Sequence, residues 1–175
     1  MASELTVQTL RGPTSGTNAN KVLIPSGQTL HAPGHVIQVV STSDSTSVTN
    51  SSSTLARVTS LSATLTPVST NSKVVIQIAS HIGFQHTNTY GKCDIYRSIS
   101  GGAATTNLSG ETGGFGNIGN GASKFPVSLT YLDSPNTIAA VTYSLSFAFS
   151  AGGTGNVYMG ANDGLSTITL MEIAG

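Results

Sequence analysis

The sequence predicts an all-β protein whose main part is an antiparallel β-sandwich of the jelly-roll kind. Long segments alternate apolar and polar residues with the period of two that a half-buried strand shows. Turn signals separate these segments at intervals of roughly 8–12 residues, the spacing of sandwiches and jelly rolls. Apolar spacings of three and four, which would indicate helices, are rare. The chain has 175 residues, enough for one domain and a modest extension.

The clearest strand is expected over residues 137–150. There one set of alternating residues is apolar and should face the core, and the other set is mostly Ser and Thr and should face water. The apolar set is Val141, Tyr143, Leu145, Phe147 and Phe149. Further strands are expected over residues 35–41, 46–57, 58–66, 73–82, 91–98, 127–132 and 166–174. This pattern predicts about eight or nine strands in all.

The composition excludes several functional classes. Charged residues make up 8% of the chain, and seven basic residues balance seven acidic ones without forming a basic stripe. We therefore expect no nucleic-acid partner and no binding to anionic membranes. A hydrophobic content of 38% argues against a disordered chain. No run of 18 apolar residues and no leader of the secretory type is found, and the single cysteine, Cys93, excludes an intrachain disulfide.

The first 34 residues form a segment of different character. They contain short apolar pairs such as Leu5 and Val7, or Val22 and Ile24, separated by Gly- and Pro-containing turns. Strands this short bury too little apolar surface to offset a chain-ordering cost of about 1–2 kcal/mol per residue. We therefore expect residues 1–34 to be a shaft segment ordered by neighbouring copies, and residues 35–175 to form the sandwich head.

Several motifs identify a resemblance that runs almost from end to end. They are the residue runs 4–10 (ELTVQTL), 33–40 (PGHVIQVV), 66–74 (TPVSTNSKV), 131–135 (YLDSP), 142–145 (TYSL) and 166–175 (STITLMEIAG). With these runs the chain resembles short trimeric fibre and appendage proteins of tailed bacteriophages, especially marine cyanophages. The resemblance implies a homotrimer that binds other virion proteins through residues 1–34 and exposes its C-terminal head. It implies no assigned site residues.

Motifs that could carry chemistry are few. Residues 114–119 (GFGNIG) match the dinucleotide pattern GxGxxG, but no strand and helix flank them, so we expect a Gly/Asn loop over residues 110–124. No GxSxG motif is present, and the histidines and Cys93 lack the spacing of a zinc site. We therefore predict no enzymatic activity, no cofactor and no metal ion held within one chain.

Two polar loops are the candidates for receptor contact. The first contributes His86, Asn88 and Tyr90, and the second contributes Phe115, Asn117 and Asn120. Loops rich in Tyr, Asn, Ser and Gly adapt well to polar partners. Phe115 has two interpretations, a local anchor packed into the head or an exposed contact for a sugar.

The predicted function is that of a virion structural protein, a trimeric short fibre whose head contacts glycans of the host surface. An alternative is a capsid cement or decoration protein, in which the same trimer would stabilise the shell. A third alternative is a carbohydrate-binding module of a larger enzyme.

Overall fold

The computed structural model describes residues 8–19, 21–24, 26, 32–85, 90–100, 104–119, 123–150, 155–160 and 164–175. The chain divides into two compact units, Met1–Ala32 and Pro33–Gly175. The second unit begins at Pro33, two residues before residue 35, where the head is expected to begin. Within the described residues every regular element is a strand.

The described residues of the second unit form eleven strands, all paired antiparallel. They are β1 (Val36–Asp44), β2 (Val48–Asn50), β3 (Ala56–Leu65), β4 (Lys73–Phe84), β5 (Gly91–Ile99), β6 (Ala104–Asn107), β7 (Asn117–Ile118), β8 (Lys124–Asp133), β9 (Val141–Phe149), β10 (Val157–Met159) and β11 (Ser166–Ile173). The prediction of an all-β, antiparallel fold is confirmed.

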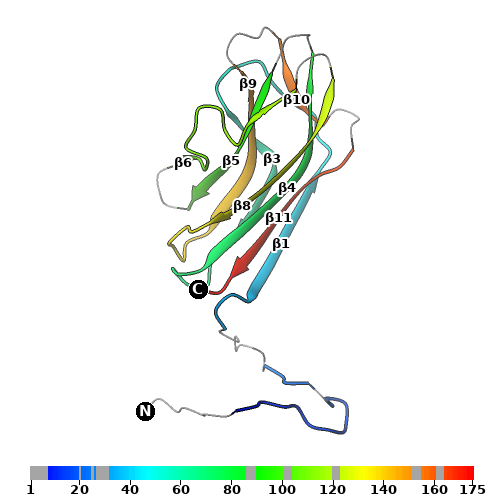
Figure 1. Cartoon of the computed structure of the whole chain (residues 1–175), viewed down its shortest axis with the longest axis vertical. Coiled ribbons are helices and arrows are strands. Elements are labelled where there is room, and N and C mark those ends of the chain that lie inside the picture. Colours follow the sequence, from blue (N-terminus) through cyan, green and yellow to red (C-terminus); the bar gives the residue numbers. More distant parts are fainter. Residues whose placement is uncertain are drawn as a thin grey trace. The chain divides into compact units, whose positions relative to one another are not determined.

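The strands form two sheets. Sheet A contains β1, β11 and β4 in that order, with β8 on the other edge of β4, and the short strands β10 and β2 extend it (Figure 1). Sheet B has the order β3, β9, β5 and β6, and β7 pairs with the start of β5. Several successive long strands lie in alternate sheets, as in a sandwich of the jelly-roll kind.

The core lies between the two sheets and follows the period-2 pattern of the sequence. In β4, for example, Val74, Ile76 and Ile78 are buried, whereas Gln77 and Ala79, on either side of Ile78, are exposed. Sheet B contributes Val141, Tyr143, Leu145 and Phe147 of β9 to the same cluster. The prediction that these two strands bury one apolar set each is therefore correct.

One prediction about β9 is wrong. Its hydroxyl-bearing face was expected to face water, but Ser144, Ser146 and Ala148 are fully buried. The reason is that β9 lies between β3 and β5 at the centre of sheet B, where side chains of neighbouring elements, among them Arg57 and Asn107, cover its outer face.

The predicted strand over residues 46–57 is also wrong, because it ends after β2 at Asn50. The Asn50 side chain accepts a hydrogen bond from the Ser52 amide and donates one to the Thr54 carbonyl oxygen, at 2.8 and 3.1 Å, which stabilises a turn before β3. The predicted loop over residues 110–124 contains the two-residue strand β7. The short strands β6, β7 and β10 were not predicted.

The described residues of the first unit form turns, with amide-to-carbonyl hydrogen bonds from Ala19 to Gly16 and from Lys21 to Asn18. They contain no strand. The apolar side chains of Leu10, Val22, Leu23 and Ile24 are all exposed, between 44% and 64% of their surface. The expectation that this segment shares strands with identical copies stays a prediction.

The first testable prediction concerns the core face of β9. Phe147→Asp places a carboxylate at a site with no solvent exposure, a cost of several kcal/mol against a total stability of about 5–15 kcal/mol. We expect loss of the cooperative thermal transition measured by circular dichroism. The matched variant Phe115→Ala, at a half-exposed position, should keep the fold and lose about 1 kcal/mol. A near-normal transition of the Phe147 variant would show that this face is not core.

Candidate functional site

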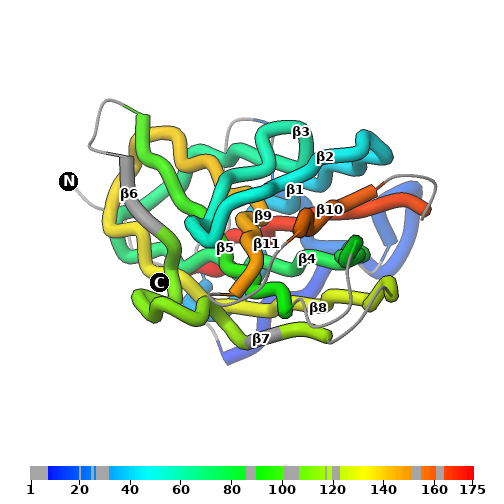
Figure 2. Tube along the Cα trace, turned by 90° about the horizontal axis from the view of Figure 1, so that it is seen from above, coloured from blue at the N-terminus to red at the C-terminus, as the bar shows by residue number. Residues whose placement is uncertain are grey.

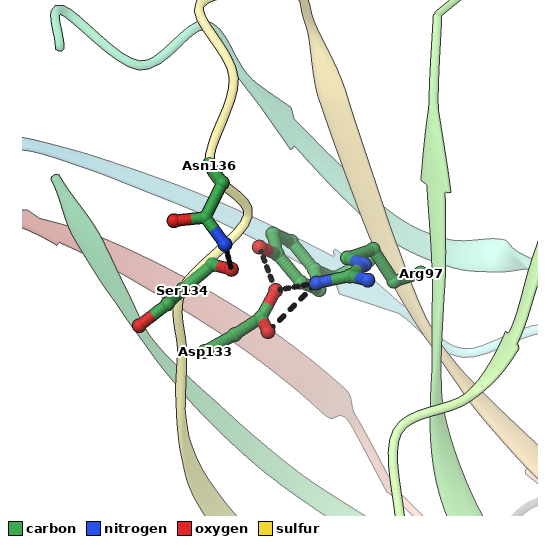
Figure 3. Close-up of polar contacts among 5 residues, drawn as sticks. Arg97, Asp133, Ser134 and Asn136 are labelled. Carbon is green, nitrogen blue, oxygen red and sulfur yellow. Dashed lines mark hydrogen bonds and ion pairs between the residues drawn. The ribbon is translucent and has the colours of Figure 1, made fainter. Parts of the chain in front are cut away.

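An ion pair between a buried carboxylate and a partly buried guanidinium group connects the two sheets at the end of β8. One guanidinium nitrogen of Arg97 in β5 donates to both carboxylate oxygens of Asp133 in β8, each at 2.8 Å (Figure 3). The hydroxyl of Tyr143 in β9 donates to the same carboxylate at 2.7 Å. The Asp133 carboxylate therefore receives hydrogen bonds from two strands of sheet B.

This cluster is arranged for structure rather than for reaction. Burial raises the pKa of Tyr143, and the neighbouring charge of Asp133 raises it further, so the phenol stays protonated and serves as a donor. After Asp133 the chain turns through Asn136, whose backbone is in the left-handed region and whose side-chain amide donates to the Ser134 carbonyl oxygen at 3.1 Å. Arg97, Asp133 and Tyr143 thus join the sheets where β8 ends.

A second polar network lies on the outer face of sheet B, over the buried face of β9. The guanidinium of Arg57 donates to the Ser144 hydroxyl at 3.0 Å and lies 5.2 Å from the ring centre of Tyr96. The Ser146 hydroxyl is bonded to the side-chain oxygen of Asn107 at 2.5 Å. These contacts provide partners for the buried hydroxyl groups of β9, and the Ser146 hydroxyl also lies within hydrogen-bond distance of the Asp94 carbonyl oxygen, at 3.2 Å.

Asp94 continues this network along β5. It is fully buried, and its carboxylate accepts hydrogen bonds from the Ile95 amide at 2.7 Å and from the amide and hydroxyl of Ser109. Two residues earlier, the ammonium group of Lys92 donates to the Thr112 carbonyl oxygen at 2.9 Å. The side chains of β5 therefore hold the segment that follows β6 against the sheet.

A depression of about 420 Å³ opens beside this network. Its walls come from the β2–β3 connection, from β5 and from the segment after β6. The lining residues are Ser53, Thr54, Leu55, Lys92, Asn107, Gly110, Glu111 and Thr112. It is the candidate recognition site.

The chemistry of this depression suits a neutral, hydroxyl-rich ligand. The ammonium of Lys92 and the carboxylate of Glu111 balance in charge, and the hydroxyls of Ser53 and Thr54 can both donate and accept. Leu55 adds an apolar surface. The lining is mostly polar, with Leu55 as its one apolar side chain, and the volume lies within the range of about 300–1,000 Å³ that is usual for small-ligand sites.

The segment that carries the GxGxxG pattern closes one side of the sandwich. The Phe115 amide donates to the Cys93 carbonyl oxygen at 2.9 Å, and β7 pairs with Gly91 and Lys92. Figure 2 shows β7 at the edge of the trace, below β8. Gly114 has a φ of +65°, and a Cβ there would lie 2.2 Å from the Cys93 carbonyl oxygen. The glycine is therefore required for close backbone approach, which explains this part of the pattern without a nucleotide.

Of the predicted receptor-contact residues, the structure brings together those that it describes. Tyr90, which is 46% exposed, precedes β5, and Asn117 pairs with Lys92 in the same region. Phe115 packs against Tyr131 of β8 with ring centres 5.3 Å apart and keeps 38% of its surface exposed. This contact favours the anchor interpretation of Phe115. His86, Asn88 and Asn120 lie outside the described residues.

The sequence did not reveal the depression itself. Lys92, Asn107 and Glu111 are separated in the sequence, and the loop over residues 53–55 was expected to be a strand. One feature of the sequence could have indicated a polar surface at this place. Lys92 and Asp94 lie on the face of β5 opposite Cys93 and Ile95, and two charged residues on one face of a strand indicate that this face is polar.

The other candidate chemistry is limited. Burial raises the pKa of the Cys93 thiol to about 12, and the adjacent Asp94 adds to this, so the cysteine is protonated at neutral pH.

Among the described residues, no group of three or more His, Cys, Asp and Glu side chains is placed to hold a metal ion. The same part of the chain has no helix long and apolar enough to cross a membrane.

No protein-family model and no curated protein sequence matches the chain. Among solved structures, it is similar to a chain in the structure of infectious bursal disease virus, Gx strain, with a TM-score of 0.48 and 13% sequence identity. The match covers 79% of this chain and 32% of that viral chain, so the chain spans about a third of its length. A likeness of this degree carries no information about function.

The second testable prediction concerns the ion pair. Asp133→Ala leaves the guanidinium of Arg97 and the hydroxyl of Tyr143 without their acceptor, and we expect a loss of about 3–5 kcal/mol in the free energy of unfolding. The matched variant Tyr143→Phe removes one donor only and should cost about 1–3 kcal/mol. Urea denaturation measures both. Equal and small losses would mean that the cluster does not join the sheets.

Proposed function

We propose that the chain is a non-enzymatic structural component of a bacteriophage virion, a trimeric short fibre whose sandwich unit is the exposed head. One observation carries the proposal, namely the contrast between the two units. The sandwich unit buries its own core, whereas the described apolar side chains of the first unit stay exposed in the single chain. A segment of this kind gains burial by association with identical copies or with other virion proteins.

Three further features support the proposal. The resemblance to phage fibre proteins begins in the first unit and continues through β11. The neutral composition, with 8% charged residues, leaves hydroxyl and amide groups as the main surface chemistry. A polar surface of this kind, together with the depression on sheet B, suits contact between the head and neutral glycans of a host cell.

The third testable prediction concerns association. The full chain should have three times the 17.7 kDa mass of one chain when measured by light scattering coupled to size exclusion. A folded species with the mass of a single chain would remove the proposal, because residues 1–32 would then be stable without copies.

The alternative within the same class is a capsid cement protein built from the same trimer. Copy number separates the two functions, since a fibre is present in far fewer copies per particle than a protein that covers the shell. Gel densitometry of purified virions should therefore give a band much weaker than that of the major shell protein. A band of comparable strength would favour cement.

The fourth testable prediction concerns the depression. Glu111→Ala removes an exposed carboxylate while the backbone hydrogen bonds at residue 111 remain, so the fold should be unchanged. Because a hydrogen bond to a charged group contributes about 1.5–3 kcal/mol, binding to an array of neutral bacterial glycans should fall at least about tenfold. Leu165→Ala, at an exposed position outside the depression, is the control. Equal signals from both variants would exclude the depression as the glycan site.

A further inference from the structure

The outer face of sheet A carries a row of apolar side chains across four strands. Val39 in β1 pairs with Met171 in β11, Met171 pairs with Val75 in β4, and Val75 pairs with Leu132 in β8. Directly paired residues of neighbouring strands lie on the same face, so the four side chains form one continuous line. We call these four residues the apolar row. Figure 1 shows their four strands side by side.

Among the described residues of the sandwich unit, none covers the apolar row fully. Val39 is 59% exposed and Leu132 is 52% exposed, while Met171 and Val75 are half-buried between them. Val36, which is 46% exposed and opens β1, and the half-buried Ile173 with which it pairs extend the patch toward the end of the sandwich. Contiguous exposed apolar surface of this kind marks an interaction site more often than isolated apolar residues do.

The surroundings of the apolar row carry little charge. The next line across the same strands is polar and uncharged, formed by Ser41, Thr169, Gln77 and Thr130. Lys73, at the start of β4, is the one charged side chain beside the apolar row among the described residues of these four strands, and it pairs with Ile173 at the end of the patch. An apolar centre with a polar rim that carries a single charge has the anatomy of a protein interface, and it limits like-charge repulsion between identical copies.

The connection to the first unit indicates which partner would reach this face. The four-residue step from Ala32 to Val36 spans at most about 14 Å. Hydrogen bonds from the Gly34 amide to the Ala174 carbonyl oxygen, at 2.8 Å, and from the Ala174 amide to the His35 carbonyl oxygen, at 2.9 Å, fix this stretch to the end of the sandwich near the apolar row. Copies held together through residues 1–32 would therefore have these ends of their sandwich units close to one another.

We propose that the apolar row is the surface through which the sandwich unit contacts the sandwich units of the other copies of the same chain. This inference rests on the proposed trimer and deepens it, because it assigns the contact to one face of sheet A. The depression on the outer face of sheet B then stays free for a ligand. The head is held by its neighbours as well as by the shared first unit.

The fifth testable prediction uses a photo-crosslinking residue in the full chain. The residue p-benzoylphenylalanine replaces Val39 or, in the control, Leu165, whose exposure of 60% matches that of Val39. After irradiation, the Val39 variant should give bands of two and three linked chains on a denaturing gel, and the Leu165 variant should give single chains. Peptide mapping should place the links in β1, β4, β8 or β11 of another copy. The same probe at Leu132 repeats the test if the Val39 variant fails to assemble.

The outcomes separate this inference from the proposed trimer. A three-chain mass with no links between chains, with equal linking from both positions, or with links only to residues 1–32 would overturn the assignment of the face and leave the trimer in place. A one-chain mass for the unsubstituted protein would overturn the trimer itself.

Discussion

The fold depends on the burial of β9 on both faces. One face supplies Tyr143, Leu145 and Phe147 to the core between the sheets, and the other places Ser144 and Ser146 beneath neighbouring side chains. A buried hydroxyl without a partner costs about 1–3 kcal/mol, so this strand is stable only if the chain supplies partners for its outer face. The polar network of sheet B follows from that requirement.

The partners determine how the chain runs after β5. Asn107 at the end of β6 bonds to Ser146, and Asp94 and Lys92 hold the following residues through Ser109 and Thr112. These hydrogen bonds place the segment after β6 beside β5. Farther along that segment, Gly114 and β7 lie against β5 and close one side of the sandwich. The depression on sheet B is thus a consequence of covering a central strand with a polar loop rather than with apolar side chains.

The two sheets therefore differ in what the chain does with their outer faces. On sheet B, the chain covers its own central strand with polar groups. On sheet A, the described residues of the sandwich unit leave the apolar row exposed, although its residues are as apolar as those of many buried strands. Because the outer face of sheet B is covered by polar groups and the apolar row of sheet A is exposed, we expect an apolar partner surface for sheet A.

The fold was largely predictable because long strands carry their own signal. In β4 and β9 the alternation is long enough to identify both the strand and its apolar core face. In β8 and β11 it identifies the strand but not the whole buried set, since Asp133 and Glu172 are buried and Leu132 is exposed. In β2, β7 and β10 the strands have two or three residues, too few to show a period. The outer face of β9 could not be predicted, since Ser and Thr in alternation look the same whether water or Asn107 is their partner. The depression could not be predicted either, because its residues come together only through the pairing of distant segments.

The short connection between the two units, from Ala32 to Val36, and the apolar row have complementary physical roles in the proposed assembly. Four apolar side chains, two of them half-buried already, supply little burial, so separate sandwich units would associate weakly. A short connection to a shared segment changes this, because linked units meet at an effective concentration in the millimolar range for short flexible linkers. A weak face is then sufficient to set the orientation of the heads. The rim, whose one charged residue among the described strands is Lys73, serves the same end, since a strongly charged rim would favour encounter from solution, which tethered copies do not need.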